Sequence, residues 1–109
     1  MSSVRPIPPR CFSYADARAL LPAIRSLTRE AQDRLAQLGV QSTETATRQA
    51  QTVVEDWIRS VTALGVGVKG MWTVDFDTGA GYYCWQYPEP DLVYFHSYED
   101  GFAGRVRVH

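Results

Sequence analysis

Apolar residues recur at spacings of three and four in two long stretches of the chain. The first stretch contains Leu20, Ile24, Leu27, Ala31, Leu35 and Leu38, and the second contains Ala46, Ala50, Val53, Trp57, Val61 and Leu64. This spacing is typical of one face of an amphipathic helix. Ser13 and Asp16 predict a capped start of the first helix, and Pro22 predicts a kink or a restart within it. Gly39 and Gly65 predict the two helix ends.

The pattern changes after Gly65. Four short runs rich in β-branched and aromatic residues predict strands at residues 66–68, 72–76, 82–86 and 92–98. Turn-forming residues at 77–81 and 88–91 separate the last three runs. The polar segment 41–44, with Ser42 or Thr43 as the next helix cap, is short enough to make the two helices antiparallel. We therefore predict an α+β fold, in which two long antiparallel helices pack on a small antiparallel β-meander.

The chain has the length and composition of one globular domain. Its 109 residues, of which 45% are hydrophobic, suffice for a core without metal or disulfide bonds. Residues 1–11 are rich in proline and predict a flexible arm, so that the domain spans residues 12–109. Cys11 and Cys84 follow no CxxC spacing and predict free thiols, although the sequence leaves a pairing between them open.

Charge and hydropathy exclude several classes of partner. A formal net charge of -1 argues against general nucleic-acid binding, which requires a basic surface. The basic end at residues 105–109 predicts only solvated charge on a flexible tail. No apolar run approaches the roughly 20 residues of a membrane span, and the first residues lack the apolar centre of a signal peptide. We expect a cytoplasmic protein that binds neither nucleic acid nor membranes.

One face of the predicted meander gathers reactive side chains. If the turn at residues 88–90 closes a hairpin, Gln86 lies opposite Leu92, Cys84 opposite Tyr94, and Tyr82 opposite His96. Because side chains alternate along a strand, the two faces then differ in chemistry. The apolar face, expected to cover the helices, carries Tyr83, Trp85, Val93 and Phe95; the other carries Tyr82, Cys84, Gln86, Tyr94, His96 and Tyr98. A shift of one residue would exchange the two faces.

The first functional hypothesis is a transition-metal site. A cysteine thiolate and a histidine imidazole are ligands that suit zinc or iron. Cys84 and His96 would form the centre of the site, and Asp75 or Glu99 would complete it. Because the chain has no CxxC or HxxH motif, these ligands can converge only through the tertiary structure.

The second hypothesis is a small enzyme. Cys84 would act as nucleophile with His96 as base, or His96 and Asp75 would act as an acid–base pair. Nothing in the sequence resembles a phosphate-binding loop or an oxyanion hole, and no substrate class is indicated.

The third hypothesis is a non-catalytic binding or assembly module. Tyr82, Tyr87, Tyr94 and Tyr98 would form an aromatic surface for a small molecule or for a second copy of the chain in a homodimer. Near the end of the chain, the guanidinium of Arg105 fits a carboxylate, and Glu89, Glu99 and Asp75 are the candidate partners.

Three segments resemble the family of short bacterial proteins catalogued as domain of unknown function family 2203. They are FSYADARALLP at residues 12–22, VDF at residues 74–76, and the run formed by Cys84-Trp85, Phe95-His96 and GFAGR at residues 101–105. The resemblance implies a cytosolic bacterial protein without an established activity. The resemblance also singles out six residues as candidate site residues: Asp75, Cys84, Trp85, Glu89, His96 and Arg105. Trp85 and Arg105 thereby join Tyr82 and Tyr94 as predicted ligand-binding residues.

Overall fold

The computed structural model describes residues 11–39 and 43–108, so that most of the predicted arm lies outside the described residues. Two helices, α1 (Tyr14–Leu38) and α2 (Glu44–Ala63), precede a five-stranded antiparallel sheet. Its strands lie in chain order: β1 (Gly67–Gly70), β2 (Thr73–Asp77), β3 (Tyr82–Gln86), β4 (Tyr94–His96) and β5 (Val106–Arg107). A short 3-10 helix, η1 (Phe102–Gly104), precedes β5. This arrangement confirms the predicted α+β fold.

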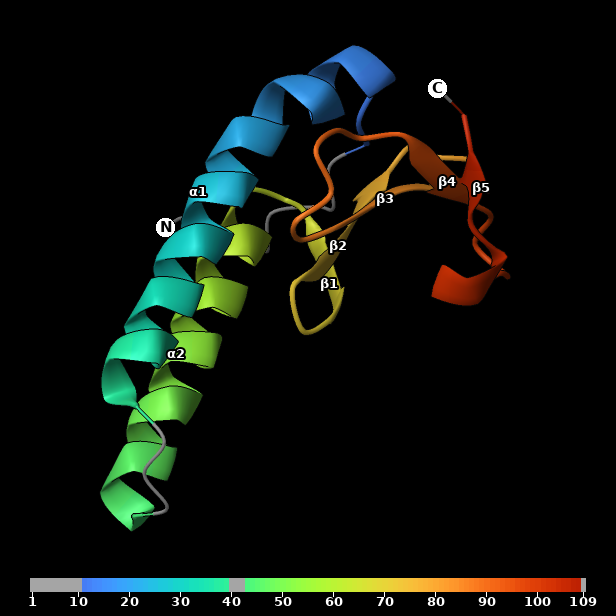
Figure 1. The fold of residues 1–109 in the computed structure, drawn as a ribbon. Helices are drawn as coiled ribbons and strands as arrows, with labels where there is room; N and C mark the ends of the chain where they lie inside the picture. The colour runs from blue at the N-terminus through green and yellow to red at the C-terminus, as the bar shows by residue number, and fades with distance from the viewer. Residues whose placement is uncertain (1–10, 40–42, 109) are drawn as a thin grey trace, which may run out of the picture.

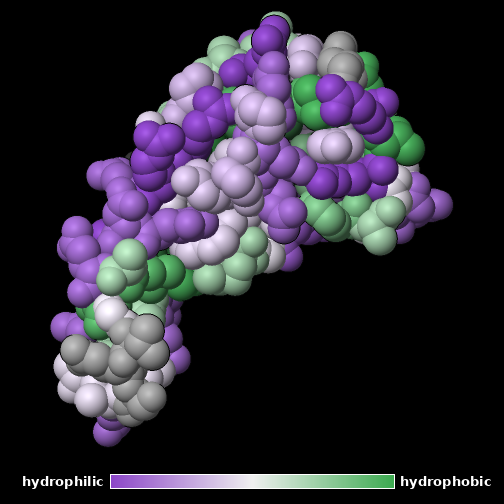
Figure 2. All heavy atoms as spheres, viewed as in Figure 1, coloured by the Kyte–Doolittle hydropathy of each residue, from purple (hydrophilic) through white to green (hydrophobic). Residues whose placement is uncertain are grey.

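The two helices form a long hairpin, and the sheet packs beside one end of it (Figure 1). The other end, formed by the C-terminus of α1 and the N-terminus of α2, extends beyond the sheet. Hydrophilic residues cover much of the visible helix surface, while hydrophobic residues gather at the sheet end and along part of the hairpin (Figure 2). No helix among the described residues is long and apolar enough to cross a membrane.

The helix boundaries follow from local signals. The Ser13 hydroxyl accepts the backbone N–H of Asp16 at 3.0 Å, and the Thr43 hydroxyl accepts that of Ala46 at 3.0 Å. Each bond satisfies an otherwise unpaired N–H of a first turn. α1 continues through Pro22 as one helix, so the predicted restart at this residue is wrong. Pro22 is exposed, so the carbonyl that loses its partner there can turn to solvent.

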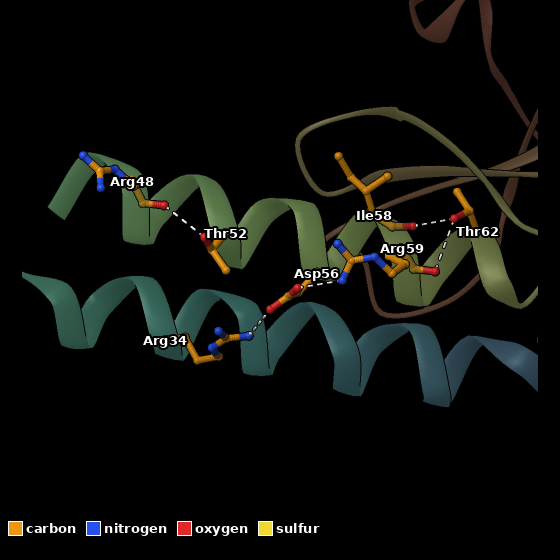
Figure 3. Close-up of polar contacts among 7 residues, drawn as sticks. All are labelled: Arg34, Arg48, Thr52, Asp56, Ile58, Arg59 and Thr62. Carbon is orange, nitrogen blue, oxygen red and sulfur yellow. Dashed lines mark hydrogen bonds and ion pairs between the residues drawn. The ribbon is translucent and has the colours of Figure 1, made fainter. Parts of the chain in front are cut away.

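A buried hydrogen bond joins the two helices. The indole Nε1 of Trp57 donates to the hydroxyl oxygen of Thr28 at 3.0 Å, and this hydroxyl donates to the carbonyl of Ile24 at 2.8 Å. At the surface, Asp56 of α2 contacts Arg34 of α1 at 3.4 Å and Arg59 at 2.9 Å (Figure 3). Exposed ion pairs contribute little to stability. The buried face therefore holds the hairpin together.

The sheet turns one face to the helices, as its alternation requires. Val74 and Phe76 of β2 and Trp85 of β3 are fully buried in the core against the helix pair. Trp85 also donates its indole N–H to the carbonyl of Glu89 at 2.8 Å. Asp75 lies between Val74 and Phe76 in sequence, and Cys84 directly precedes Trp85. Both therefore point to the opposite face of the sheet. The predicted separation of faces is confirmed for β3.

Two strand predictions differ from the structure. The predicted strand at 92–98 shortens to β4, and the carbonyl of Leu92, outside β4, accepts the hydroxyl of Tyr14 at 2.8 Å. The predicted flexible tail contains β5, which pairs with β4 through Phe95 and Val106. Two residues are too few to show an alternating pattern, so β5 leaves no signal in the sequence.

Gly81 leaves room for the ring of Phe95. A Cβ at this position would overlap that ring and lie 2.7 Å from the carbonyl oxygen of His96. We expect Gly81→Ala to lower the free energy of unfolding by about 1–3 kcal/mol, because the backbone of β4 would have to shift. Urea denaturation measures the change. Gly70→Ala is the control, since its Cβ would meet nothing within 4 Å. Equal stability of the two variants would contradict the expected overlap.

Candidate metal centre

Asp75, Cys84 and His96 meet on the sheet face that points away from the helices. Asp75 of β2 is paired with Cys84 of β3, and Cys84 is paired with Tyr94 of β4, two residues before His96. One ligand atom from each of the three residues lies within 4.8 Å of the other two. All three residues are at most 2% exposed. The fold thus brings three metal-ligating groups from three strands into one buried cluster.

Both ring nitrogens of His96 face oxygen acceptors. Nδ1 lies 3.0 Å from the carbonyl oxygen of Ser97, and Nε2 lies 3.1 Å from Oδ1 of Asp75. Because a carbonyl can only accept, Nδ1 carries a proton, and Nε2 of a neutral ring then presents a lone pair to the carboxylate. With lone pairs on both Nε2 and Oδ1, this contact needs a proton or a metal ion between the two atoms.

The second carboxylate oxygen of Asp75 has no hydrogen-bond donor among the described residues. Oδ2 is buried, and the ammonium of Lys69 lies 3.9 Å away, an ion-pair distance without a hydrogen bond. The Lys69 side chain is about half exposed and also lies over the ring of Tyr82 at 5.2 Å. A buried carboxylate oxygen without a donor is costly, so Oδ2 is suited to a directly bound cation.

The thiol of Cys84 is protonated at neutral pH in this arrangement. Burial, with a further contribution from the Asp75 carboxylate, raises the pKa of the thiol to about 12, and the guanidinium of Arg105 opposes this shift. A free thiolate at this position is therefore scarce. A metal ion changes this balance because a coordinated thiol loses its proton.

Arg105 is held firmly beside the cluster. Its Nη2 pairs with Oε2 of Glu89 at 2.6 Å, and the other oxygen of Glu89 accepts the backbone N–H of Gln86 at 2.8 Å. The guanidinium lies between the rings of Tyr94 and Phe102, 3.9 Å and 4.0 Å from their centres. Burial lowers the pKa of Arg105, but the hydrogen bond and the charge of Glu89, together with Cys84, outweigh this effect, so the pKa lies above its ordinary value. Among the three predicted partners, the structure selects Glu89.

The other predicted site residues lie at different distances from the cluster, and one is on the other face of the sheet. Tyr82 and Tyr94 lie on the same face as the cluster, and the Tyr82 ring lies 5.3 Å from that of His96. Trp85 lies in the core on the helix side, so it cannot contact a ligand at this site. Glu99 is exposed and is not part of the cluster, because β4 ends at His96 and the chain turns away. Cys11 and Cys84 are both free thiols.

Sequence reasoning missed Lys69. The predicted strand at 66–68 stopped one residue before it, whereas β1 continues to Gly70. The pairing of β1 with β2 shifts register between Val68 and Gly70, so regular alternation does not assign a face to Lys69. The tertiary structure places its ammonium 3.9 Å from Asp75.

A comparison with protein families gives one match. The family described as "Uncharacterized conserved protein (DUF2203)" matches residues 10–108. The chain belongs to this family. The match extends over both helices, all five strands and the three clustered residues, so the candidate centre lies within the family's own domain. The comparisons with curated proteins and with solved structures give no match.

Proposed function

We propose that the protein binds one divalent transition-metal ion, with zinc as the first choice, through Asp75, Cys84 and His96. The proposal rests on the buried carboxylate of Asp75, which has one oxygen without a hydrogen-bond donor among the described residues and the other 3.1 Å from Nε2 of His96. A cation bonded to Asp75 and His96 would give Oδ2 of Asp75 a partner and would accept the lone pair of Nε2 of His96.

The donor set supports this choice of metal. Nitrogen, sulfur and carboxylate oxygen are the ligands of zinc, at distances of about 2.0–2.3 Å. A tetrahedral ion would need donor atoms about 3.3–3.8 Å apart, and the three atoms already lie within 4.8 Å of one another. The bond from Nδ1 of His96 to the Ser97 carbonyl is the outer contact that orients a ligating histidine.

The number of protein ligands indicates the type of site. Structural zinc sites have four protein ligands, whereas catalytic sites have three and leave one position for water or substrate. Asp75, Cys84 and His96 supply three, and Glu99 does not complete the set. The proposed ion therefore has a fourth position for water or a small ligand.

The geometry gives less support to a cysteine nucleophile. Both nitrogens of His96 have oxygen partners, so neither is directed at the thiol as a base would be. The pKa of the Cys84 thiol, raised to about 12, opposes attack as a free thiolate. The pair formed by His96 and Asp75 keeps the geometry of an acid–base pair, and it is the alternative for a protein that binds no metal.

Metal titration tests the proposal. Chelator-treated protein is expected to bind Zn²⁺ with one ion per chain, measured by competition with a chromophoric chelator. Co²⁺ in the same site is expected to give an intense near-ultraviolet thiolate-to-metal charge-transfer band, because Cys84 binds as the thiolate. Absence of this band and of stoichiometric zinc binding would reject the proposal and leave Asp75 and His96 as a hydrogen-bonded pair.

The location and assembly of the protein are proposals of the same kind. A free, metal-ligating thiol suits the reducing cytoplasm, where thiols stay reduced. The aromatic face expected to pair in a homodimer is partly occupied within the chain itself, since Arg105 lies over the ring of Tyr94. Tyr98 is still half exposed, so sedimentation of the intact protein can test the homodimer.

A further inference from the structure

We infer that Arg105 is a positioning residue of the metal centre, whose Nη1 donates a hydrogen bond to the sulfur of Cys84 when the thiol is bound to metal as thiolate. This inference rests on the proposed function. It assigns to Arg105 a role beyond its ion pair with Glu89.

The first observation is an unused donor. Nη1 of Arg105 is buried and has no hydrogen-bond partner among the described residues, whereas Nη2 is paired with Glu89. A buried N–H without an acceptor is costly, and a guanidinium has five such groups in a rigid fork. The fold therefore keeps a charged donor available at the edge of the cluster.

The second observation is the position of this donor. Arg105 lies over the ring of Tyr94, which is the strand partner of Cys84. The Cys84 thiol and the guanidinium are close enough to affect each other's charge. A protonated thiol is a weak acceptor, but a thiolate carries negative charge and accepts a much stronger bond. Metal binding would thus create the acceptor that Nη1 lacks.

The third observation is that several contacts fix the guanidinium of Arg105. The rings of Tyr94 and Phe102 enclose the guanidinium, and Glu89 fixes one of its nitrogens. Glu89 is in turn fixed by the backbone N–H of Gln86, two residues from Cys84. A donor held in this way loses little conformational freedom when it bonds to the sulfur. It resembles the outer contacts that orient ligands and tune metal sites.

The consequence concerns the charge balance of the centre. A divalent ion with one thiolate and one carboxylate is neutral, but the sulfur keeps excess electron density in a buried site. An N–H bond from Arg105 withdraws part of that density and holds the sulfur in place. Arg105 is therefore expected to raise metal affinity and the energy of the sulfur-to-metal charge-transfer transition.

Arg105→Gln tests the inference on the intact protein. We expect zinc affinity to fall about 10–100-fold, as for other outer contacts of metal ligands, and the Co²⁺ charge-transfer band to move to longer wavelength. Arg105→Lys keeps the charge without the planar fork and is expected to give intermediate values. Arg107→Gln is the matched control, because it removes the same charge from an exposed position of β5 and should leave both measurements unchanged.

The band position separates a direct role from a merely structural one, since a loosened but intact site would not lose a hydrogen bond to sulfur. If wild-type protein forms the Co²⁺ band and both Arg105 variants match it in affinity and wavelength, the inference is wrong while the metal site stands. If wild-type protein forms no band, the proposed function itself fails. If Arg105→Gln does not fold, Arg105→Lys decides between these outcomes.

Discussion

His96→Ala is expected to reduce bound zinc from one ion per chain to a trace, because it removes the ligand that also orients Asp75. Cys84→Ser is expected to have a similar effect, since a serine hydroxyl is a poor zinc ligand at neutral pH. Equilibrium dialysis followed by elemental analysis measures the stoichiometry. Cys11→Ser is the matched control, because Cys11 is an exposed free thiol.

Zinc binding should also be visible as stabilisation of the fold, and the variants should differ in this stabilisation. Free zinc at 100 times its dissociation constant is expected to stabilise the wild-type fold by about 2.7 kcal/mol, because the ion binds the folded chain. His96→Ala should gain nothing, whereas Glu99→Gln should gain as much as the wild type, since Glu99 lies outside the cluster. Thermal unfolding with and without zinc tests this. Loss of zinc stabilisation in Glu99→Gln would restore Glu99 as a ligand.

The largest expected effect on stability belongs to Trp85. Trp85→Ala should lower the free energy of unfolding by about 3–5 kcal/mol, because it opens a cavity at the centre of the core. Trp85→Phe retains most of the apolar contact but loses the bond to the Glu89 carbonyl, so a smaller loss of about 1–2 kcal/mol is expected. Chemical denaturation measures both changes.

Trp85 also separates the two faces of the sheet experimentally. Its side chain lies on the helix side, opposite to the cluster. The folded fraction of Trp85→Phe is therefore expected to bind zinc with an affinity close to that of the wild type, measured by chelator competition. A loss of affinity comparable to that of Arg105→Gln would contradict this placement and would favour the ligand-binding role predicted for Trp85 from sequence.

The charges around the cluster bear on what could occupy the fourth position of the proposed ion. Lys69 approaches Asp75 from the side of β1, and Arg105 lies on the side of β4 and β5. Glu89 neutralises Arg105, whereas Lys69 is half exposed. Beside the proposed neutral core of metal, thiolate and carboxylate, the charge of Lys69 would favour a neutral or anionic ligand over a cationic one.

The sequence by itself determined the elements that depend on neighbours along the chain. The helices followed from a periodic apolar face and from caps at Ser13 and Thr43, because these signals act within a few residues. The hairpin of β3 and β4 followed from its turn, and its register places Cys84 opposite Tyr94 as predicted. Cross-strand neighbours are a direct consequence of register, so strand alternation and the turn placed Cys84 and His96 on one face. The convergence of both residues with Asp75 within 4.8 Å is a property of the tertiary structure.

Only the tertiary structure decided the features that join distant segments. It left Glu99 exposed, selected Glu89 as the partner of Arg105, and added Lys69 at the edge of the cluster. It also made a strand of Val106–Arg107, which are too few to carry a pattern. These outcomes depend on which surfaces meet and what they bury. Alternation and spacing describe only one strand or helix at a time, so they cannot encode such contacts.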